Sequence, residues 1–187
     1  MTTTVPKLLT ADDLLRLHSE GVYGELIRGE LHETMPPGEQ HGTIMAEITA
    51  LLVMFVKRFR LGRVTAGDAG VWIERDPDTV RGPDIAFFST ERMQAGPPLP
   101  GYSVTVPDLV VEIVSPNNKS LEVYDKARMW LSHGVRMVWV VQPVSRTVDV
   151  HRSDVGVEVV PEDGVIGGGD VLPEFTCPIS DIFPPAG

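Results

Sequence analysis

The sequence is poor in cysteine and has no long apolar run. Its 187 residues include one cysteine, Cys177, which excludes an internal disulfide and a zinc site built from several cysteines. A single cysteine suits the reducing cytoplasm, where we expect the protein to act. The most apolar helical stretch, residues 44–56, contains Glu47 and is too short to cross a bilayer. The first residues lack the basic and apolar regions of a secretory signal, so we expect no membrane partner.

Basic residues are also scarce. The 16 lysines and arginines face 26 acidic residues, which gives a net charge of −10. A net negative charge does not favour a protein that coats nucleic acid through its overall electrostatic field. A local basic patch is still compatible with this charge. One group of basic residues gathers at the end of a predicted helix: Lys57, Arg58, Arg60 and Arg63. Contact with phosphates and simple solvation of a helix end both explain this group.

The length and composition indicate one domain over residues 1–187, with a core at about 8–183. Apolar residues at three- and four-residue spacing predict helices at 41–59 and 119–133. Alternating or continuous apolar runs predict strands or hairpins at 22–33, 64–74, 85–88, 109–114, 135–141 and 147–160. The C-terminal tail, residues 167–183, is expected to lie over a sheet edge. This order predicts an α/β (α+β) fold with a mixed central sheet flanked by helices. A glycine-rich dinucleotide motif between a strand and a helix is absent.

Glu112 is the most informative acidic residue. It interrupts an otherwise apolar run, Leu-Val-Val-Glu-Ile-Val at 109–114, which is typical of a strand covered on both faces. A charged and unpaired carboxylate is costly to bury there. Glu112 therefore either points into a polar cleft or binds a cation, or it lies on the exposed face of an edge strand.

Two aspartates that follow prolines are candidate partners for Glu112. Asp84 lies at the start of the strand predicted at 85–88, and two acids on adjacent strands can hold Mg²⁺, which prefers oxygen ligands. Asp108 shares a face with Glu112 but lies about 13 Å away along an extended strand. This separation is too large for one ion, so Asp84 is the better partner. A loop–strand junction is also an ordinary place for Pro-Asp.

Lys126 has two interpretations. On the helix predicted at 119–133 it lies beside an apolar stripe that includes Val123 and Trp130. Its ammonium either extends outward into solvent or reaches the polar end of the strand that carries Glu112. In the second position it would orient a water or stabilise negative charge on phosphorus. Glu25, His41 and Glu47 are further candidates that capping and solvation explain equally well.

Several motifs, in this order, resemble those of the Uma-type restriction endonuclease family of the PD-(D/E)xK nuclease superfamily. The motifs are Tyr-Gly-Glu-Leu-Ile-Arg-Gly-Glu-Leu at 23–31, Arg-Gly-Pro-Asp-Ile-Ala-Phe at 81–87, Pro-Asp-Leu-Val-Val-Glu-Ile-Val-Ser-Pro at 107–116, Lys-x-x-x-Trp at 126–130 and Val-Trp-Val-Val at 138–141. The resemblance runs from about residue 8 to about residue 183. It implies a restriction-endonuclease-like fold and Mg²⁺-dependent hydrolysis of DNA phosphodiester bonds, with Mn²⁺ as a substitute.

The resemblance also implies roles for individual residues. Asp84 and Glu112 match the two metal-binding acids, and Lys126 matches a lysine displaced to the following helix. The usual lysine position of the superfamily falls at Val114, which cannot serve. Glu25 and His41 match accessory positions. DNA is the implied substrate, and a homodimer is implied as well.

Two other functions remain open at the level of the sequence. A non-catalytic interaction protein would keep the fold and use its acids structurally. A hydrolase of small phosphoesters would use the same metal chemistry without cutting DNA.

Overall fold

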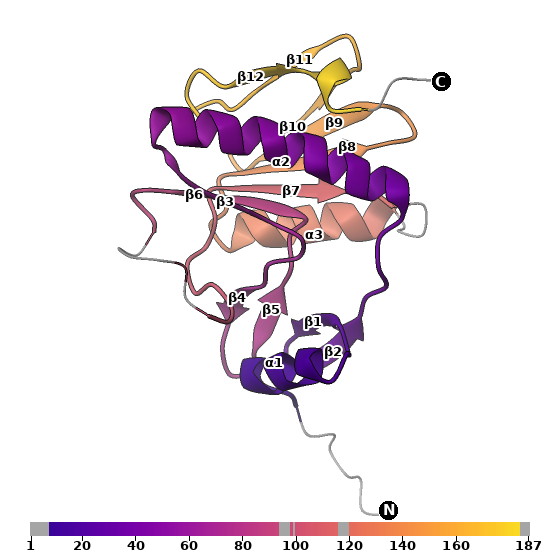
Figure 1. Ribbon diagram of the computed structural model, residues 1–187, viewed down its shortest axis with the longest axis vertical. Coiled ribbons are helices and arrows are strands. Elements are labelled where there is room, and N and C mark those ends of the chain that lie inside the picture. Colours follow the sequence, from indigo (N-terminus) through magenta and orange to yellow (C-terminus); the bar gives the residue numbers. More distant parts are fainter. Residues whose placement is uncertain (1–7, 94–97, 99, 116–119, 184–187) are drawn as a thin grey trace, which may run out of the picture.

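The computed structural model describes residues 8–93, 98, 100–115 and 120–183. Within these residues the chain forms a six-stranded, a four-stranded and a two-stranded sheet (Figure 1). The helices are α1 (Ala11–Ser19), α2 (Glu39–Phe59), α3 (Ser120–Ser132) and the short 3-10 helix η1 (Ile179–Asp181). The predicted helix start at Lys119 lies outside the described residues. None of these helices has the length and apolarity needed to span a bilayer.

The six-stranded sheet has the order β10-β9-β8-β7-β6-β3. Only β7 and β8 run parallel, and α3 supplies the crossover between them, as a parallel pair requires. The strands are β3 (Gly62–Ala66), β6 (Ile85–Ser89), β7 (Leu109–Ile113), β8 (Met137–Gln142), β9 (Thr147–Arg152) and β10 (Gly156–Val160). The predicted mixed sheet flanked by helices is therefore confirmed.

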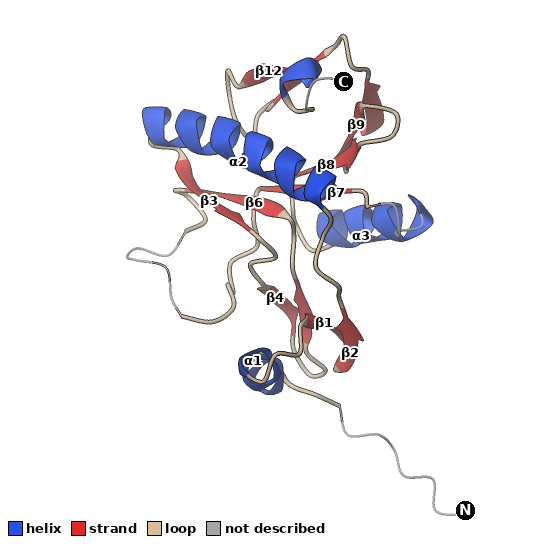
Figure 2. Cartoon of the chain, turned by 45° about the vertical axis from the view of Figure 1, so that its right-hand side comes forward, coloured by secondary structure: helices blue, strands red, loops and turns tan. Residues whose placement is uncertain are grey.

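Helices α2 and α3 cover opposite faces of this sheet (Figures 1 and 2). The apolar stripe of α2 packs on one face of β6, β7 and β8, while Val123, Ala127 and Trp130 of α3 pack on the other. Side chains alternate along a strand, so Val110 and Glu112 of β7 point to the α3 face. The fold thus places a carboxylate between the sheet and α3.

The four-stranded sheet has the order β2-β1-β5-β4 and lies beside α1. Its strands are β1 (Gly24–Ile27), β2 (Glu30–Glu33), β4 (Val71–Glu74) and β5 (Thr79–Arg81). Arg28 and Gly29 both have positive φ, at 52° and 81°, in the tight turn that joins β1 to β2. The hairpin predicted within residues 22–33 is confirmed.

One prediction about the strands was wrong. Residues 64–74 do not form a hairpin, because β3 pairs with β6 while β4 pairs with β5 in the other sheet. The tail belongs to the same core cluster as Val160 of the edge strand β10. It forms β11 (Val165–Gly167) and β12 (Thr176–Pro178) and packs on the sheet face that α2 covers, where the Phe175 ring contacts Phe55 and Trp139.

Candidate active site

Glu112 is held from two sides by α3. Its Oε1 accepts a hydrogen bond of 2.7 Å from Trp130 Nε1, and its Oε2 lies 3.0 Å from Lys126 Nζ. The side chain is only 6% exposed. Glu112 therefore lies in a central strand, and the interpretation that placed it on an exposed edge is wrong. Each carboxylate oxygen still has a second lone pair available for another ligand.

Lys126 reaches inward from α3 rather than outward into solvent. Its ammonium donates to the Gly82 carbonyl at 2.8 Å and lies 3.0 Å from Glu112 Oε2 and 3.1 Å from Glu25 Oε1. These three acceptors match the three protons of an ammonium group. Burial alone would lower the pKa of Lys126, but attraction to Glu112 and Glu25 outweighs it and raises the pKa above its ordinary value. Lys126 is therefore a permanent cation and not a general base.

Glu25 comes from the four-stranded sheet and completes this ionic group. Its Oε1 accepts a hydrogen bond from the Gly82 amide at 2.8 Å, and its Oε2 lies 2.9 Å from Arg81 Nε. Burial raises the pKa of Glu25, but Lys126, Arg81 and the Gly82 amide together outweigh it, and the net pKa lies below its ordinary value. Glu25 is thus a stable anion that ties the small sheet to α3.

Asp84 lies immediately before β6 and next to the N-terminal turn of α2. Its Oδ2 accepts a hydrogen bond of 2.6 Å from the amide of Ile113, the neighbour of Glu112. Its Oδ1 lies 3.2 Å from His41 Nε2, without the geometry of a hydrogen bond. Burial lowers the pKa of His41, partly opposed by Asp68, so the neutral imidazole is favoured. The structure thus brings Asp84, Glu112, Lys126, Glu25 and His41 into one group.

The two central acids titrate near neutrality. Burial raises the pKa of Glu112 to about 7, with Lys126 opposing the change and Asp84 adding to it. Burial also raises the pKa of Asp84 to about 6, against the hydrogen bond from Ile113 and the attraction of Lys126. The pKa values of both partners in this ion pair are raised, which favours the charge on Lys126 and disfavours the charge on Glu112. Lys126 is cationic because two carboxylates attract it, while Glu112 also faces a second acid, Asp84.

The charges around this group leave room for a divalent cation. Four carboxylates (Glu25, Asp68, Asp84 and Glu112) face two permanent cations (Arg81 and Lys126). Within the described part of the chain, no cluster of three or more His, Cys, Asp or Glu side chains has the arrangement of a metal site. Mg²⁺ is commonly held by one or two carboxylates and otherwise by water and substrate oxygens. Asp84 and Glu112 fit this mode of binding.

Two acids considered from the sequence lie elsewhere. Asp108 accepts a hydrogen bond from the Ser89 amide at 2.8 Å and lies 3.0 Å from Arg92 Nε. Asp108 is buried and connects its own segment to Ser89 and Arg92. It does not join the group around Glu112. Glu47 is exposed on α2.

The basic residues at the end of α2 lie far from the candidate site. Lys57 is 16 residues beyond His41 on α2, which corresponds to roughly 24 Å along the helix at 1.5 Å per residue. Lys57, Arg58 and Arg60 are all exposed. They cannot touch a phosphate that is bound at Asp84, so any contact with a nucleic acid would be to a distant part of it.

Four residues of the group were not singled out from the sequence: Asp68, Arg81, Gly82 and Trp130. Arg81 and Gly82 directly precede Pro83-Asp84, and Trp130 lies one helical turn after Lys126. These three residues therefore belong to the motifs that contain Asp84 and Lys126. Gly82 passes close to Asp68, since an added Cβ on Gly82 would lie 3.0 Å from the Asp68 carbonyl oxygen. Nothing in the sequence pattern indicated Asp68.

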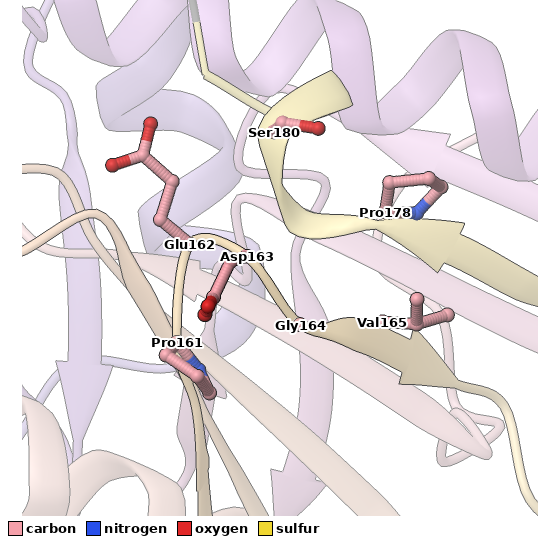
Figure 3. Close-up of a pocket in the computed structure, with 7 residues that line it drawn as sticks. All are labelled: Pro161, Glu162, Asp163, Gly164, Val165, Pro178 and Ser180. Carbon is pink, nitrogen blue, oxygen red and sulfur yellow. The ribbon is translucent and has the colours of Figure 1, made fainter.

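A separate surface cavity of about 610 Å³ lies near the C-terminal strands (Figure 3). It is lined by Pro161, Glu162, Asp163, Gly164, Val165, Pro178 and Ser180. Its two charged residues are acids, and Glu162 is paired with Arg146 at 2.6 Å. This lining offers no cation to a phosphate, so we do not place the active site there.

Comparison with known proteins identifies the family of this chain. The model of the Uma2 family, described as "Putative restriction endonuclease", matches residues 11–180. The chain belongs to the Uma2 family. It is also similar to a solved structure from Anabaena variabilis ATCC 29413, described as "a putative nuclease belonging to DUF820". The two chains are 25% identical, with a TM-score of 0.80, over 94% of this chain and 97% of the other. None of the curated proteins matches the chain.

Membership of Uma2 confirms the resemblance drawn from the motifs. The mixed sheet and its helices match those of a nuclease-like structure over nearly the whole length of both chains. The Uma2 description names an enzyme that acts on nucleic acid. The roles of single residues and the identity of the metal are not part of these comparisons.

Proposed function

We propose that this Uma2 protein is a Mg²⁺-dependent endonuclease that hydrolyses phosphodiester bonds in DNA. The observation that supports it best is the contact of Lys126 Nζ with Glu112 Oε2 and with the Gly82 carbonyl, two residues before Asp84. A cation and two acids from distant parts of the sequence meet in one place. Such a group is needed to bind a metal and to stabilise charge on a phosphate.

Asp84 and Glu112 would hold the metal. When bound, a divalent cation supplies Lewis acidity toward the phosphate and makes a coordinated water more acidic. The hydrogen bonds from Ile113 and Trp130 fix the orientation of the two carboxylates. Because both carboxyls titrate near neutrality, a cation would compete with protons for them.

Lys126 would act by charge and position. Its raised pKa keeps it protonated, so it can orient the attacking water or stabilise negative charge that develops on phosphorus. Glu25 and Arg81 would hold Lys126 in place from the small sheet. His41, with its lowered pKa, is an accessory group next to Asp84 that can accept a proton or contact the substrate.

The same arrangement supports one endonuclease-like domain over residues 1–187, with its core at about residues 8–183. The candidate site takes Glu25 and Arg81 from the four-stranded sheet, and it takes Glu112 from the six-stranded sheet. Separating these sheets would dismantle the site. We place the enzyme in the cytoplasm, where the single buried thiol of Cys177 would stay reduced.

Cleavage of supercoiled plasmid and of single-stranded DNA with Mg²⁺ or Mn²⁺ tests this function. Glu112→Gln keeps the shape of the side chain but loses its charge, and it should reduce the cleavage rate by about 10² or more. Glu47→Gln, an exposed acid on α2, is the matched control and should cut like the wild type. Equal inertness of wild type and Glu112→Gln, without metal binding, would favour a non-catalytic interaction protein. Turnover of bis(p-nitrophenyl) phosphate without DNA cleavage would favour a hydrolase of small phosphoesters.

A further inference from the structure

Strand β10 forms one edge of the six-stranded sheet. It pairs with β9 through five consecutive residues, from Gly156 opposite Arg152 to Val160 opposite Val148. In the described part of the chain no strand pairs with its outer side. The outer side of β10 therefore offers a row of backbone groups to another strand.

The edge has few of the features that usually block strand pairing. Proteins protect such edges with charged side chains, proline or a bulge, and β10 carries one charge, Glu158, but no lysine, proline or bulge in Gly-Val-Glu-Val-Val. Val155, Val157 and Val159 occupy alternate positions and are 70%, 57% and 61% exposed. Because side chains alternate along a strand, Val157 and Val159 share one face of the sheet. Val155 lies in the turn before β10, next to Gly156, which has a φ of 95°.

We propose that β10 pairs with β10 of a second copy of this chain, antiparallel and around a two-fold axis at Val157. An antiparallel edge is self-complementary, so a two-fold axis satisfies the backbone groups of both copies. In this register Val157 faces Val157 of the second copy, and Val159 is opposite the turn residue Val155 of the second copy. The Val157 side chain exposed in one copy would be covered by that of the other.

The charge on β10 selects this register. A two-fold axis at Glu158 would set Glu158 against Glu158 of the second copy, and directly opposed like charges are unfavourable. An axis at Val157 sets Glu158 against Gly156 instead, which carries no side chain. The sequence of β10 therefore favours a two-fold axis at Val157 over an axis at Glu158. The interface does not involve Asp84, Glu112 or Lys126, so it does not depend on the nuclease proposal.

Sedimentation of the full chain over a wide range of concentrations tests the interface. We expect the wild type to be a dimer and Val157→Lys to be a monomer with an unchanged circular dichroism spectrum. Val144→Lys is the matched control, because Val144 is 95% exposed in the turn between β8 and β9, outside the edge. It should leave the dimer intact. A wild type that stays monomeric, or a dimer that Val157→Lys does not disrupt, would overturn the proposal and leave the edge to a different partner.

Cysteine cross-linking tests the register. Val157→Cys should form a disulfide between copies under mild oxidation, because residues directly opposite in antiparallel strands have Cα atoms about 4.5–5.5 Å apart. Val159→Cys should not, since its two copies would be four residues apart along the pair, about 13 Å. The native Cys177 is buried and would not compete. Equal cross-linking of both variants would contradict an axis at Val157.

Discussion

Lys126 Nζ on α3 and Glu112 Oε2 on β7 lie 3.0 Å apart and form a nearly buried ion pair. The same nitrogen lies 3.1 Å from Glu25 Oε1, so one ammonium joins carboxylates from two sheets. Helix α3 is thereby fixed against the strand that carries Glu112. Disturbing this pair is expected to change both the folding stability and the proposed activity.

Lys126→Ala should lower the DNA cleavage rate by about 10²–10³, because the transition state loses a fixed cation. It should also lower the free energy of unfolding by about 3 kcal/mol, since Glu25 and Glu112 are left buried without this partner. Cleavage assays and urea unfolding measure the two effects. Arg128→Ala is the control, because Arg128 pairs with Asp125 on the exposed side of α3. Full activity of Lys126→Ala would contradict the assigned role.

Trp130→Phe should reduce cleavage by about 10- to 100-fold, as expected for a group that orients a metal ligand. The substitution keeps a ring against the sheet but removes the donor to Glu112 Oε1. Trp139→Phe is a matched control on the opposite face of the sheet, where Trp139 Nε1 contacts Met137 Sδ instead. Both variants should lose a similar, small amount of stability. If both reduced cleavage equally, Trp130 would be structural only.

The affinity for Mn²⁺ should fall as the pH decreases from about 8 to about 5.5. In the metal-free protein, burial raises the pKa of Asp84 from 3.8 to about 6 and the pKa of Glu112 from 4.5 to about 7. Both carboxyls take up protons in this range, and a cation must displace those protons. Calorimetry near pH 6.5 in buffers of different ionisation enthalpy should show proton release. An affinity that does not change with pH would contradict the assignment.

The same two pKa values determine how the folding stability of the metal-free protein depends on pH. The folded chain binds more protons than the unfolded chain between the ordinary and the raised pKa values. The two carboxyls therefore stabilise the metal-free protein at the acidic end of this range, and that contribution is lost as the pH rises through 6 and then 7. Thermal unfolding with and without Glu112→Gln measures it, and the variant should depend less on pH.

Lys57→Gln combined with Arg58→Gln should weaken DNA binding and reduce its dependence on salt. Each lost phosphate contact should lower the slope of log K against log salt by about 0.9. Both side chains are exposed, so the fold should be unaffected. Arg16→Gln is the control, because Arg16 pairs with Asp13 at 2.7 Å on α1. Unchanged binding of the double variant would show that this group is only a solvated helix end.

The parts of the fold with strong local patterns were predictable from the sequence. The apolar stripe of α2, the buried run around Glu112 and the Arg28-Gly29 turn each have a period or a turn signature. Pairing between distant strands was not predictable in the same way. Strand β5 has only three residues, too few to show alternation, and without it β4 seemed to pair with β3.

The central residues of the candidate site were predictable because each one breaks a local pattern. Glu112 interrupts an apolar strand, and Lys126 lies beside an apolar stripe. Their partners on the small sheet depend on tertiary packing. The Gly82 backbone bonds both Glu25 and Lys126 because β5 delivers it between β1 and α3, and no spacing in the sequence encodes that position. Asp68 joins the group for the same reason.

A crystal soaked in Mn²⁺ tests the central claim most directly. We expect an anomalous difference peak within bonding distance of oxygens from both Asp84 and Glu112, at about 2.1 Å as for Mg²⁺ ligands, and no such peak in Glu112→Gln. The Lys126 ammonium should remain next to Glu112. Saturating Mn²⁺ with no peak between these two carboxylates, or with a peak only at another place on the molecule, would contradict the account.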